Sequence, residues 1–189
     1  MQNGPHATFL FVADRVQDET LARMHDKAAL LSLADSLSLR VPRTTLARSR
    51  AELKRAIGEY PAYFGRAAFS RGGVELLTNT GPLAGLLSLD ECRPTPDNPW
   101  LVQEYVEGED ICTFSIAHHG RLTAHSTYVH PRELEHAGGI VFESIRDDDA
   151  YHAVSELVRA TDYHGQLSFD FRRTDDGVVL IECNPRPTA

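Results

Sequence analysis

The sequence is short of cysteine and of long apolar runs. Its 189 residues include 3 cysteines, and their odd number and wide separation argue against both a disulfide framework and a Cys-x-x-Cys zinc site. The cysteines are Cys92, Cys112 and Cys183. The apolar stretch Phe9–Val12 is far too short for a membrane span or for the core of a signal peptide. These absences predict a protein of the reducing cytoplasm.

Positive charge is also scarce. The chain has 19 Lys and Arg residues against 27 Asp and Glu residues, which gives a formal net charge of −8. Such a balance argues against a surface for nucleic acid or for an anionic membrane. It is compatible with a nucleotide site, where a few local cations suffice. With 42% hydrophobic residues, the chain can bury the core of one large domain or of two small ones.

The residues that carry chemistry gather near the C-terminus, in a predicted hairpin. Leu167, Phe169 and Phe171 alternate with polar residues, which predicts a strand with one apolar face. The segment Thr174–Gly177 has the composition of a turn. The apolar run Val178–Ile181 then predicts a second strand, buried on both faces.

Oxygen-bearing side chains follow this apolar run. Glu182 and Asn184 are two positions apart and so share one face of the strand. Folding the hairpin at its turn brings Asp170 opposite Glu182, so that two carboxylates and an amide oxygen converge. Such ligands suit a magnesium ion that shares its remaining sites with phosphates, and Arg186 could clamp a phosphate or carboxylate beside it. The alternative is an ordinary hairpin with a polar, solvated face.

Tyr-x-Gly-Gln-x-Ser-x-Asp followed by Ile-Glu-Cys-Asn-Pro-Arg resembles the magnesium-binding end of the ATP-grasp superfamily, as in the large chain of carbamoyl phosphate synthetase and in biotin carboxylase. The resemblance implies that Asp170, Glu182 and Asn184 hold magnesium under the triphosphate of ATP. Arg186 matches the family arginine that contacts the substrate or the transferring phosphate, and it is the catalytic candidate. Cys183, between two proposed ligands, should point away from the metal.

The same resemblance implies two cations for the phosphates. Lys27 lies in a helix expected over residues 18–39 and matches a lysine that contacts nucleotide phosphate, although alone it would be an ordinary solvated helix residue. A strand over residues 60–66 and a small-residue loop after it could fold over the triphosphate. The family has a cation at the position of Gly65, so we expect Arg66 to replace it by way of a one-residue bulge.

A further segment resembles the ATP-grasp hinge, where backbone groups bind adenine. By this match Gln103 lies near the adenine amine, and Glu104 and Val106 offer main-chain groups. Asp110 would bind the ribose hydroxyls, with Glu109 as the rival for that role. The alternative is an exposed acidic turn between strands.

Other patterns are purely structural. Ser49–Glu52 is a capping box that opens a helix to about residue 59. Leucines predict a short helix over residues 81–91, and a hairpin is expected to turn at His119–Gly120. A helix is expected over residues 147–161. Three aspartates at its start would cap its positive end, so we do not expect them to bind metal.

Histidines on the predicted hairpin raise the question of a zinc site. They are His118, His119, His125 and His130. Their spacings match no zinc finger and no helical pair, and strand histidines commonly face solvent or a hydrogen-bond partner. We therefore expect no zinc site from these four residues.

Together these patterns predict an α+β protein with the ATP-grasp fold. A small lid subdomain over residues 42–101 would fold over a larger antiparallel-sheet subdomain over residues 102–189, incomplete at its C-terminus. Residues 1–41 would be the remnant of a preceding domain and a connecting helix. Family enzymes usually have a whole α/β domain before this region and continue well past the Asn-Pro-Arg segment, so we expect a fragment or a shortened protein.

The function implied is that of an ATP- and magnesium-dependent, ADP-forming ligase, or of a fragment of one. A carboxylate would attack the γ-phosphate to give an acyl phosphate, and an amine or a thiol would then displace phosphate. Magnesium, Lys27, Arg66 and Arg186 would spread the transferring charge. The expected partners are ATP, small carboxylate and amine substrates, and companion domains or a second copy, but neither nucleic acid nor membrane. The alternatives are a non-catalytic nucleotide-binding module and an acidic β-rich scaffold without a ligand.

Overall fold

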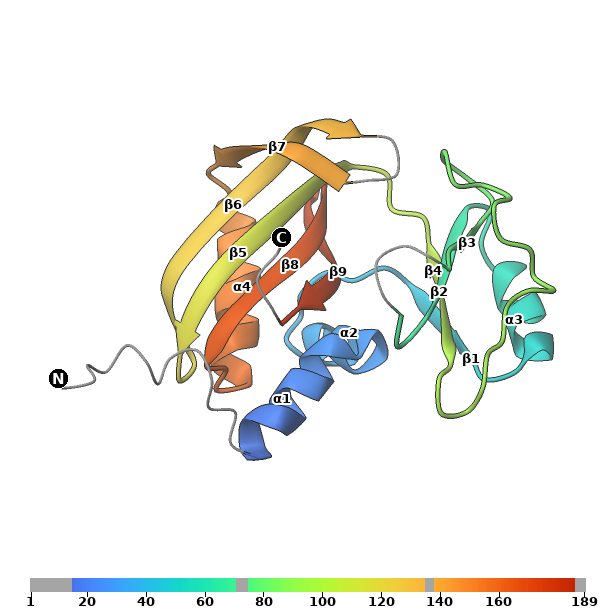
Figure 1. Ribbon diagram of the computed structural model, residues 1–189, viewed down its shortest axis with the longest axis horizontal. Coiled ribbons are helices and arrows are strands. Elements are labelled where there is room, and N and C mark those ends of the chain that lie inside the picture. The colour runs from blue at the N-terminus through green and yellow to red at the C-terminus, as the bar shows by residue number, and fades with distance from the viewer. Residues whose placement is uncertain (1–14, 71–74, 135–137, 186–189) are drawn as a thin grey trace, which may run out of the picture.

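The structure is a computed structural model, and it describes residues 15–70, 75–134 and 138–185. Within these residues the chain forms four helices and nine strands in two antiparallel sheets (Figure 1), which confirms the predicted α+β class. In chain order the elements are α1 (Arg15–His25), α2 (Lys27–Ser36), β1 (Thr44–Ala47), α3 (Arg50–Ile57), β2 (Tyr63–Ala67), β3 (Leu77–Thr78), β4 (Trp100–Glu104), β5 (Glu109–His118), β6 (Arg121–Leu134), β7 (Gly138–Ile145), α4 (Asp148–Ala160), β8 (Gly165–Thr174) and β9 (Gly177–Asn184). No helix in the described segments is long and apolar enough to span a bilayer.

The helix expected over residues 18–39 is in fact two helices, α1 and α2, divided at Asp26. Asp26 has an extended backbone, and its carboxylate accepts hydrogen bonds from Ala28 N at 2.9 Å and from Ala29 N at 3.2 Å. Aspartate at this position satisfies the free N–H groups of a helix start. The prediction of one continuous helix was wrong because Asp26 caps a new helix, and Lys27 becomes the first residue of α2.

The smaller sheet has the strand order β1-β4-β2-β3, and α3 covers its outer side (Figure 1). The predicted capping box begins α3, with Ser49 Oγ accepting a hydrogen bond from Glu52 N at 3.3 Å. Leu53 and Trp100 are buried in the core between this helix and the sheet. Residues 81–91 form turns instead of the expected helix. Gly81 and Gly85 have φ angles of +75° and +76°, which a helix cannot contain.

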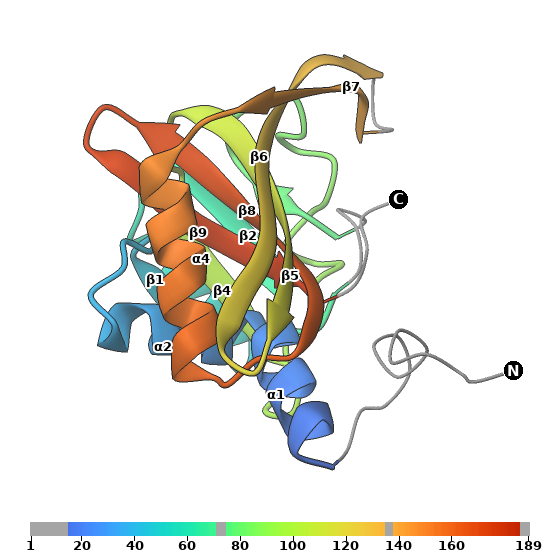
Figure 2. The same ribbon diagram turned by 90° about the vertical axis from the view of Figure 1, so that its left-hand side faces the viewer.

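The larger sheet has the strand order β7-β6-β5-β8-β9. The helix α4, predicted by the sequence, packs against one face of it together with α1 and α2 (Figures 1 and 2). Leu157 of α4 and the alternating Leu167, Phe169 and Phe171 of β8 are buried in this core. The intervening polar residues of β8, among them Asp170, therefore project from the opposite face.

The C-terminal hairpin has the predicted register at its chemical end, where Asp170 lies directly opposite Glu182. The next pair is Phe171 with Leu180, so Ile181 is an extra residue in β9 and forms a β-bulge. The apolar run was expected to be buried throughout, but Ile181 is only half-buried. The bulge turns Ile181 toward the smaller sheet, where its carbonyl accepts a hydrogen bond from Arg66.

Candidate nucleotide and metal site

The three residues predicted to bind metal lie together on the face of the larger sheet that α4 does not cover. Asn184 Nδ2 lies 3.3 Å from Asp170 Oδ2 and 3.3 Å from Glu182 Oε1. Strand β8 supplies the first carboxylate, and β9 supplies the second carboxylate and the amide. Cys183, between them, is buried in the core on the other face, as predicted.

Two buried cations from other elements meet the same carboxylate. Arg66 of β2 donates from Nη1 to Glu182 Oε2 at 2.6 Å and from Nη2 to Ile181 O at 2.9 Å. Lys27 Nζ at the start of α2 lies 3.9 Å from Glu182 Oε2. Arg66 is 7% exposed and Lys27 is 6% exposed. The cations predicted for the phosphates therefore lie directly beside the residues predicted for the metal.

Arg66 reaches this place without the bulge expected at Gly65. Strand β2 pairs with β4 in continuous register from Tyr63 to Ala67, so the prediction of a bulge was wrong. Because strand residues alternate between faces, Arg66 shares its face with Phe64, whose ring centroid lies 5.8 Å from the guanidinium carbon. Gly65 belongs to the other set, where an added Cβ would lie 3.2 Å from Leu77 O. The family resemblance expects the cation at Gly65, but in this strand it is the next residue, Arg66, whose side chain lies on the face of the site.

The charges in the cluster are unevenly held. Burial, and then the negative charge of Glu182, raises the pKa of Asp170 to about 7. Burial would also raise the pKa of Glu182, but the charges of Arg66 and Lys27 outweigh it and lower that pKa. Burial and the charge of Arg66 lower the pKa of Lys27. The two buried cations thus stabilise the charged form of Glu182, whereas the charged form of Asp170 is not stabilised to the same extent.

The donor set fits magnesium, which prefers oxygen ligands. The amide of Asn184 donates to both carboxylates, and a half-turn of this nearly symmetric group would present its oxygen instead. Arg66 Nε is buried and finds no hydrogen-bond partner among the described residues. A buried donor of this kind is costly unless an acceptor reaches it, and a phosphate oxygen is such an acceptor.

The predicted adenine residues line a pocket between the two sheets. Gln103 is 3% exposed, and its Nε2 donates to Thr44 Oγ1 at 3.2 Å. The N–H of Glu104 donates to Arg43 O at 3.0 Å, so the main-chain group that Glu104 can offer a ligand is its carbonyl. The residues lining this pocket are Pro42, Phe64, Gln103, Glu104, Tyr105, Val106, Arg172 and Ile181.

Of the two acids considered for the ribose, Asp110 lies on the side of this pocket. Asp110 is opposite Arg172 in the β5–β8 ladder, and its Oδ1 lies 3.0 Å from Arg172 Nε, which belongs to a residue of the pocket wall. Glu109 falls in the other alternating set of β5, with Ile111, which is buried in the core under α4.

Two features of the site were not predicted from the sequence. Cys112 lies directly opposite Asp170 in the β5–β8 ladder. Its spacing of two from Asp110 is a signal for the same face. Burial, and then the negative charge of Asp170, raises the pKa of Cys112. Ile181 forms part of the pocket wall through the bulge.

Arg186, the catalytic candidate, lies outside the described residues.

Comparison with known proteins supports a single family. A family model described as an ATP-grasp domain matches residues 85–189, more than half of the chain. No curated protein sequence matches the chain significantly.

Solved structures share the fold. The phosphoribosylamine–glycine ligase of Thermotoga maritima aligns with a TM-score of 0.69 and 15% identity over 94% of this chain and 52% of its own. The biotin carboxylase domain of the Hydrogenobacter thermophilus 2-oxoglutarate carboxylase, in complex with MgADP and bicarbonate, aligns with a TM-score of 0.67 and 14% identity over 90% of this chain and 42% of its own. The ATP-grasp ligase PsnB with its minimal precursor aligns at 0.61 and 16% identity, over 90% of this chain and 55% of its own. The chain spans about half of the length of these structures, and the likeness confirms the predicted fold.

Proposed function

The chain belongs to the ATP-grasp domain family, and from this premise we propose that it binds ATP with magnesium between its two sheets, as the nucleotide-binding part of an ADP-forming carboxylate–amine or carboxylate–thiol ligase. The observation that carries the proposal is the meeting of three oxygen-bearing side chains with two buried cations. They are Asp170, Glu182, Asn184, Lys27 and Arg66. An ordinary solvated hairpin would not bury two cations against its polar face, because burial of charge is costly.

The adenine is proposed to occupy the pocket between the sheets. Phe64 and Ile181 offer apolar surface for the base. The carbonyl of Glu104 and the N–H of Val106 are main-chain groups suited to its polar edge. Gln103 is buried beside them and would face the adenine amine.

The ribose and the phosphates would follow from this pocket toward the metal residues. Asp110 would accept hydrogen bonds from the ribose hydroxyls, exchanging part of its contact with Arg172. Lys27 and Arg66 would donate to phosphate oxygens, and Arg66 Nε is already a buried donor in need of an acceptor. Arg66 would then give up Glu182, which a divalent cation can take over.

Asp170, Glu182 and Asn184 would hold magnesium. When bound, magnesium supplies positive charge that polarises the phosphoryl oxygens. A carboxylate oxygen of the acid substrate would form a bond to the γ-phosphorus while the bond to the bridging oxygen of ADP breaks. An amine or thiol would then attack the acyl carbon, phosphate would leave, and the nucleophile would lose its proton. Lys27 and Arg66 would position the triphosphate and balance its charge in the first of these steps.

We also propose the division into a lid and a larger subdomain. The boundary expected between residues 101 and 102 would divide β4, so the proposed lid is the smaller sheet with residues 42–104, and residues 105–189 would form the larger subdomain. Of residues 1–41, the helices α1 and α2 pack on the larger sheet. The ion pair between Arg66 and Glu182 supports a closed arrangement of the two parts.

Calorimetric titration with ATP, in the presence and absence of magnesium, tests the proposal. We expect binding of ATP that depends on magnesium and that Asp170→Asn abolishes. The matched control is Asp176→Asn, at a turn where the aspartate side chain is 87% exposed, and it should bind as the wild type does. Binding that ignores magnesium, or that survives Asp170→Asn unchanged, would contradict the proposed site.

A second candidate is a nucleotide-binding module without turnover. The observation that favours it is the engagement of Arg66 by both Glu182 and Ile181 O, which leaves fewer donors for a transferring phosphate. Assays of ADP formation with panels of carboxylic acids paired with amines or thiols separate the two. ADP formation that needs both an acid and a nucleophile supports the ligase, and tight binding without ADP formation supports the module.

A further inference from the structure

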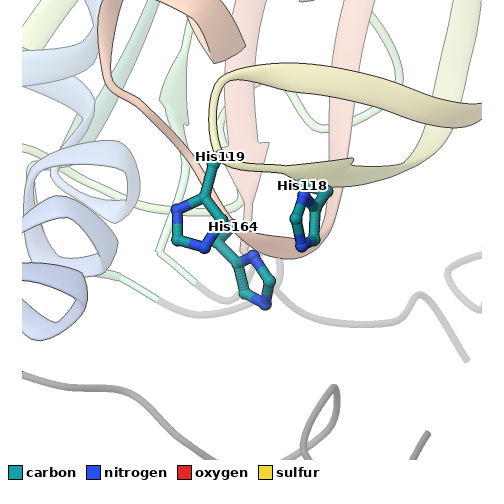
Figure 3. Close-up of side chains that lie close together, drawn as sticks. All are labelled: His118, His119 and His164. Atoms are coloured by element: carbon teal, nitrogen blue, oxygen red, sulfur yellow. The ribbon is translucent and has the colours of Figure 1, made fainter. Parts of the chain in front are cut away.

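Three histidines from two separate segments lie together at the far end of the larger sheet. His118 ends β5, His119 begins the turn to β6, and His164 immediately precedes β8. One ring nitrogen from each lies within 4.8 Å of the others, and the ring centroids are 4.6, 4.8 and 5.0 Å apart (Figure 3). His118 and His119 are exposed, and His164 is half-buried. Figure 3 shows the three rings grouped around one another beside the turn.

The backbone explains how two consecutive histidines come to the same place. Neighbouring residues of a regular strand point to opposite faces. His119 has a φ of +45° and Gly120 a φ of +73°, so the alternation ends at this tight turn. A left-handed backbone is uncommon for a residue with a side chain, although histidine tolerates it better than most. The turn brings the ring of His119 beside that of His118 instead of across the sheet from it.

The turn is also anchored to the segment that carries the third histidine. Gly120 N donates to Tyr163 O at 3.0 Å, next to His164. An added Cβ on Gly120 would lie 3.2 Å from Asp162 Oδ1, so the two segments are in close contact. Asp162 itself has a φ of +47°, and its Oδ2 lies 4.0 Å from His119 Nδ1. The cluster therefore has a carboxylate close to one of its imidazoles.

We propose that His118, His119 and His164 bind a borderline divalent metal ion, with zinc as its representative, in a site separate from the nucleotide site. Imidazole nitrogen is a preferred ligand for zinc, and three histidines with a water molecule form a complete tetrahedral set. Asp162 would accept a hydrogen bond from His119 Nδ1 and leave Nε2 for the metal, as carboxylates do for many metal-binding histidines.

The distances allow this coordination with small movements. Zinc–nitrogen bonds of about 2.0–2.1 Å hold tetrahedral nitrogens about 3.4 Å apart, so the ring nitrogens, which lie within 4.8 Å of one another, must approach by at most about 1.4 Å. Rotation of exposed rings provides that movement.

The site is distinct from the magnesium site in place and in chemistry. His118 lies six residues along β5 from Cys112, the neighbour of Asp170, and six strand residues span about 20 Å. The ligands here are nitrogens, which suit zinc, copper or nickel, whereas the other site offers oxygens, which suit magnesium. The bound ion would join the β5–β6 turn to the segment before β8 and so hold one end of the sheet together.

The other strand histidines have different roles. His125 lies 2.9 Å from Ser115 Oγ through Nδ1 and 3.0 Å from Thr127 Oγ1 through Nε2, so both of its nitrogens are engaged. His130 packs against the rings of Tyr128 and Phe142. The four strand histidines considered from the sequence thus divide into two that join His164 and two that do not.

Zinc titration of the tag-free protein by calorimetry, without nucleotide, tests the proposal. We expect one zinc ion per chain and no competition from magnesium. His164→Gln and His119→Asn should each weaken zinc binding at least about tenfold, since even indirect supports of a metal site are worth that much. Asparagine is chosen at position 119 because it tolerates the left-handed backbone. The matched control, His152→Gln, replaces an exposed histidine on α4 and should leave zinc binding unchanged.

Further measurements separate zinc at the three histidines from zinc at the acidic cluster. Asp170→Asn should keep its zinc affinity, whereas loss of zinc binding in that variant would place the ion at the acidic cluster instead. Cobalt in place of zinc should give the visible absorption of a tetrahedral ion. If His164→Gln does not fold, as judged by circular dichroism, His118→Gln at an exposed position serves in its place. The absence of zinc binding, or affinity unchanged in the histidine variants, would mean that the three rings merely pack together, and it would leave the nucleotide proposal unaffected.

Discussion

Arg66 Nη1 lies 2.6 Å from Glu182 Oε2, and this ion pair joins two sheets through residues 116 positions apart. Both residues are proposed to contact ligands, one a phosphate and the other magnesium. In the structure they neutralise each other, with Lys27 Nζ 3.9 Å from the same carboxylate oxygen. A buried ion pair that loses one member leaves an uncompensated charge, which is strongly destabilising. A phosphate that binds Arg66 therefore leaves Glu182 without its partner, and magnesium that binds Glu182 leaves Arg66 without its partner. Binding of both ligands together satisfies both residues.

The first prediction concerns Arg66 and the phosphates. Arg66→Gln should weaken ATP binding by about 1.5–3 kcal/mol, the usual contribution of a hydrogen bond to a charged group, and should weaken AMP binding much less. The reason is that the triphosphate, and not the base, is proposed to reach the guanidinium. Calorimetry with the two nucleotides measures the difference. Arg50→Gln is the control, because Arg50 begins α3 and is hydrogen bonded to Asp90. Equal losses for ATP and AMP would count against a phosphate contact.

The second prediction concerns Asp170 and pH in the metal-free protein. Burial and the charge of Glu182 raise the pKa of Asp170 to about 7 from an ordinary value of 3.8. The folded state then holds this proton more tightly than the unfolded state, so the stabilisation is complete below about pH 4 and is lost as the pH rises through about 7. The free energy of unfolding should fall across this window by up to about 1.4 kcal/mol per pH unit from this group.

Urea unfolding in the presence of EDTA measures this dependence. Other groups titrate over the same range, so the quantity of interest is the difference between the wild type and Asp170→Asn, which has no carboxyl to titrate. Glu182, whose pKa is lowered, acts in the opposite sense but below the ordinary range of glutamate. Parallel pH profiles for the two proteins would show that Asp170 is not protonated preferentially in the folded state.

The third prediction distinguishes Asp110 from Glu109 as the ribose ligand. Asp110→Ala should weaken ATP binding by about 1–3 kcal/mol, the cost of leaving polar partners unsatisfied. Glu109→Ala is the matched control, since Glu109 belongs to the face of β5 that includes the core residue Ile111. ADP and AMP should lose as much as ATP does, because all three contain the ribose. A loss of ATP affinity in Glu109→Ala alone would mean that Glu109, one residue earlier in β5, is the ribose ligand instead of Asp110.

Much of the C-terminal hairpin could be predicted because its signals are local. The alternation around Phe169 and the position of the turn fix which residue of β8 faces Glu182. The bulge at Ile181 could not be predicted in the same way. It depends on Arg40 O, which accepts a hydrogen bond from Leu180 N at 2.9 Å, and on Arg66, which binds Ile181 O. Both partners come from distant parts of the chain.

The errors and omissions elsewhere have similar causes. A bulge at Gly65 was inferred from the family resemblance, yet continuous pairing of β2 with β4 makes it unnecessary. The break at Asp26 arises because the Asp26 carboxylate accepts a hydrogen bond from a backbone N–H group and so begins a new helix. The prediction of one helix relied on the spacing of apolar residues and gave this capping signal no weight. The histidine cluster depends on the left-handed backbone of His119 and on the approach of His164, neither of which any spacing in the sequence expresses.

The last prediction follows from the exchange of partners between Arg66 and Glu182. Magnesium alone would take Glu182 and leave Arg66 buried without its counterion, and ATP alone would take Arg66 and leave Glu182 exposed to Asp170. Together the ligands satisfy both, so the melting temperature should rise far more with magnesium and a non-hydrolysable ATP analogue than with either alone. Binding at a hundredfold excess over Kd adds about 2.7 kcal/mol to the free energy of unfolding, which raises the melting temperature by about 5–10 °C for a chain of this size.

Glu182→Gln should erase most of this synergy, because the amide keeps the shape but supplies no charge. Glu156→Gln, which alters a surface pair with Arg159 on α4, is the control and should keep it. Thermal unfolding of the three proteins under the four ligand conditions decides the matter: shifts that simply add for the two ligands, or a full joint shift in Glu182→Gln, would contradict the proposed exchange.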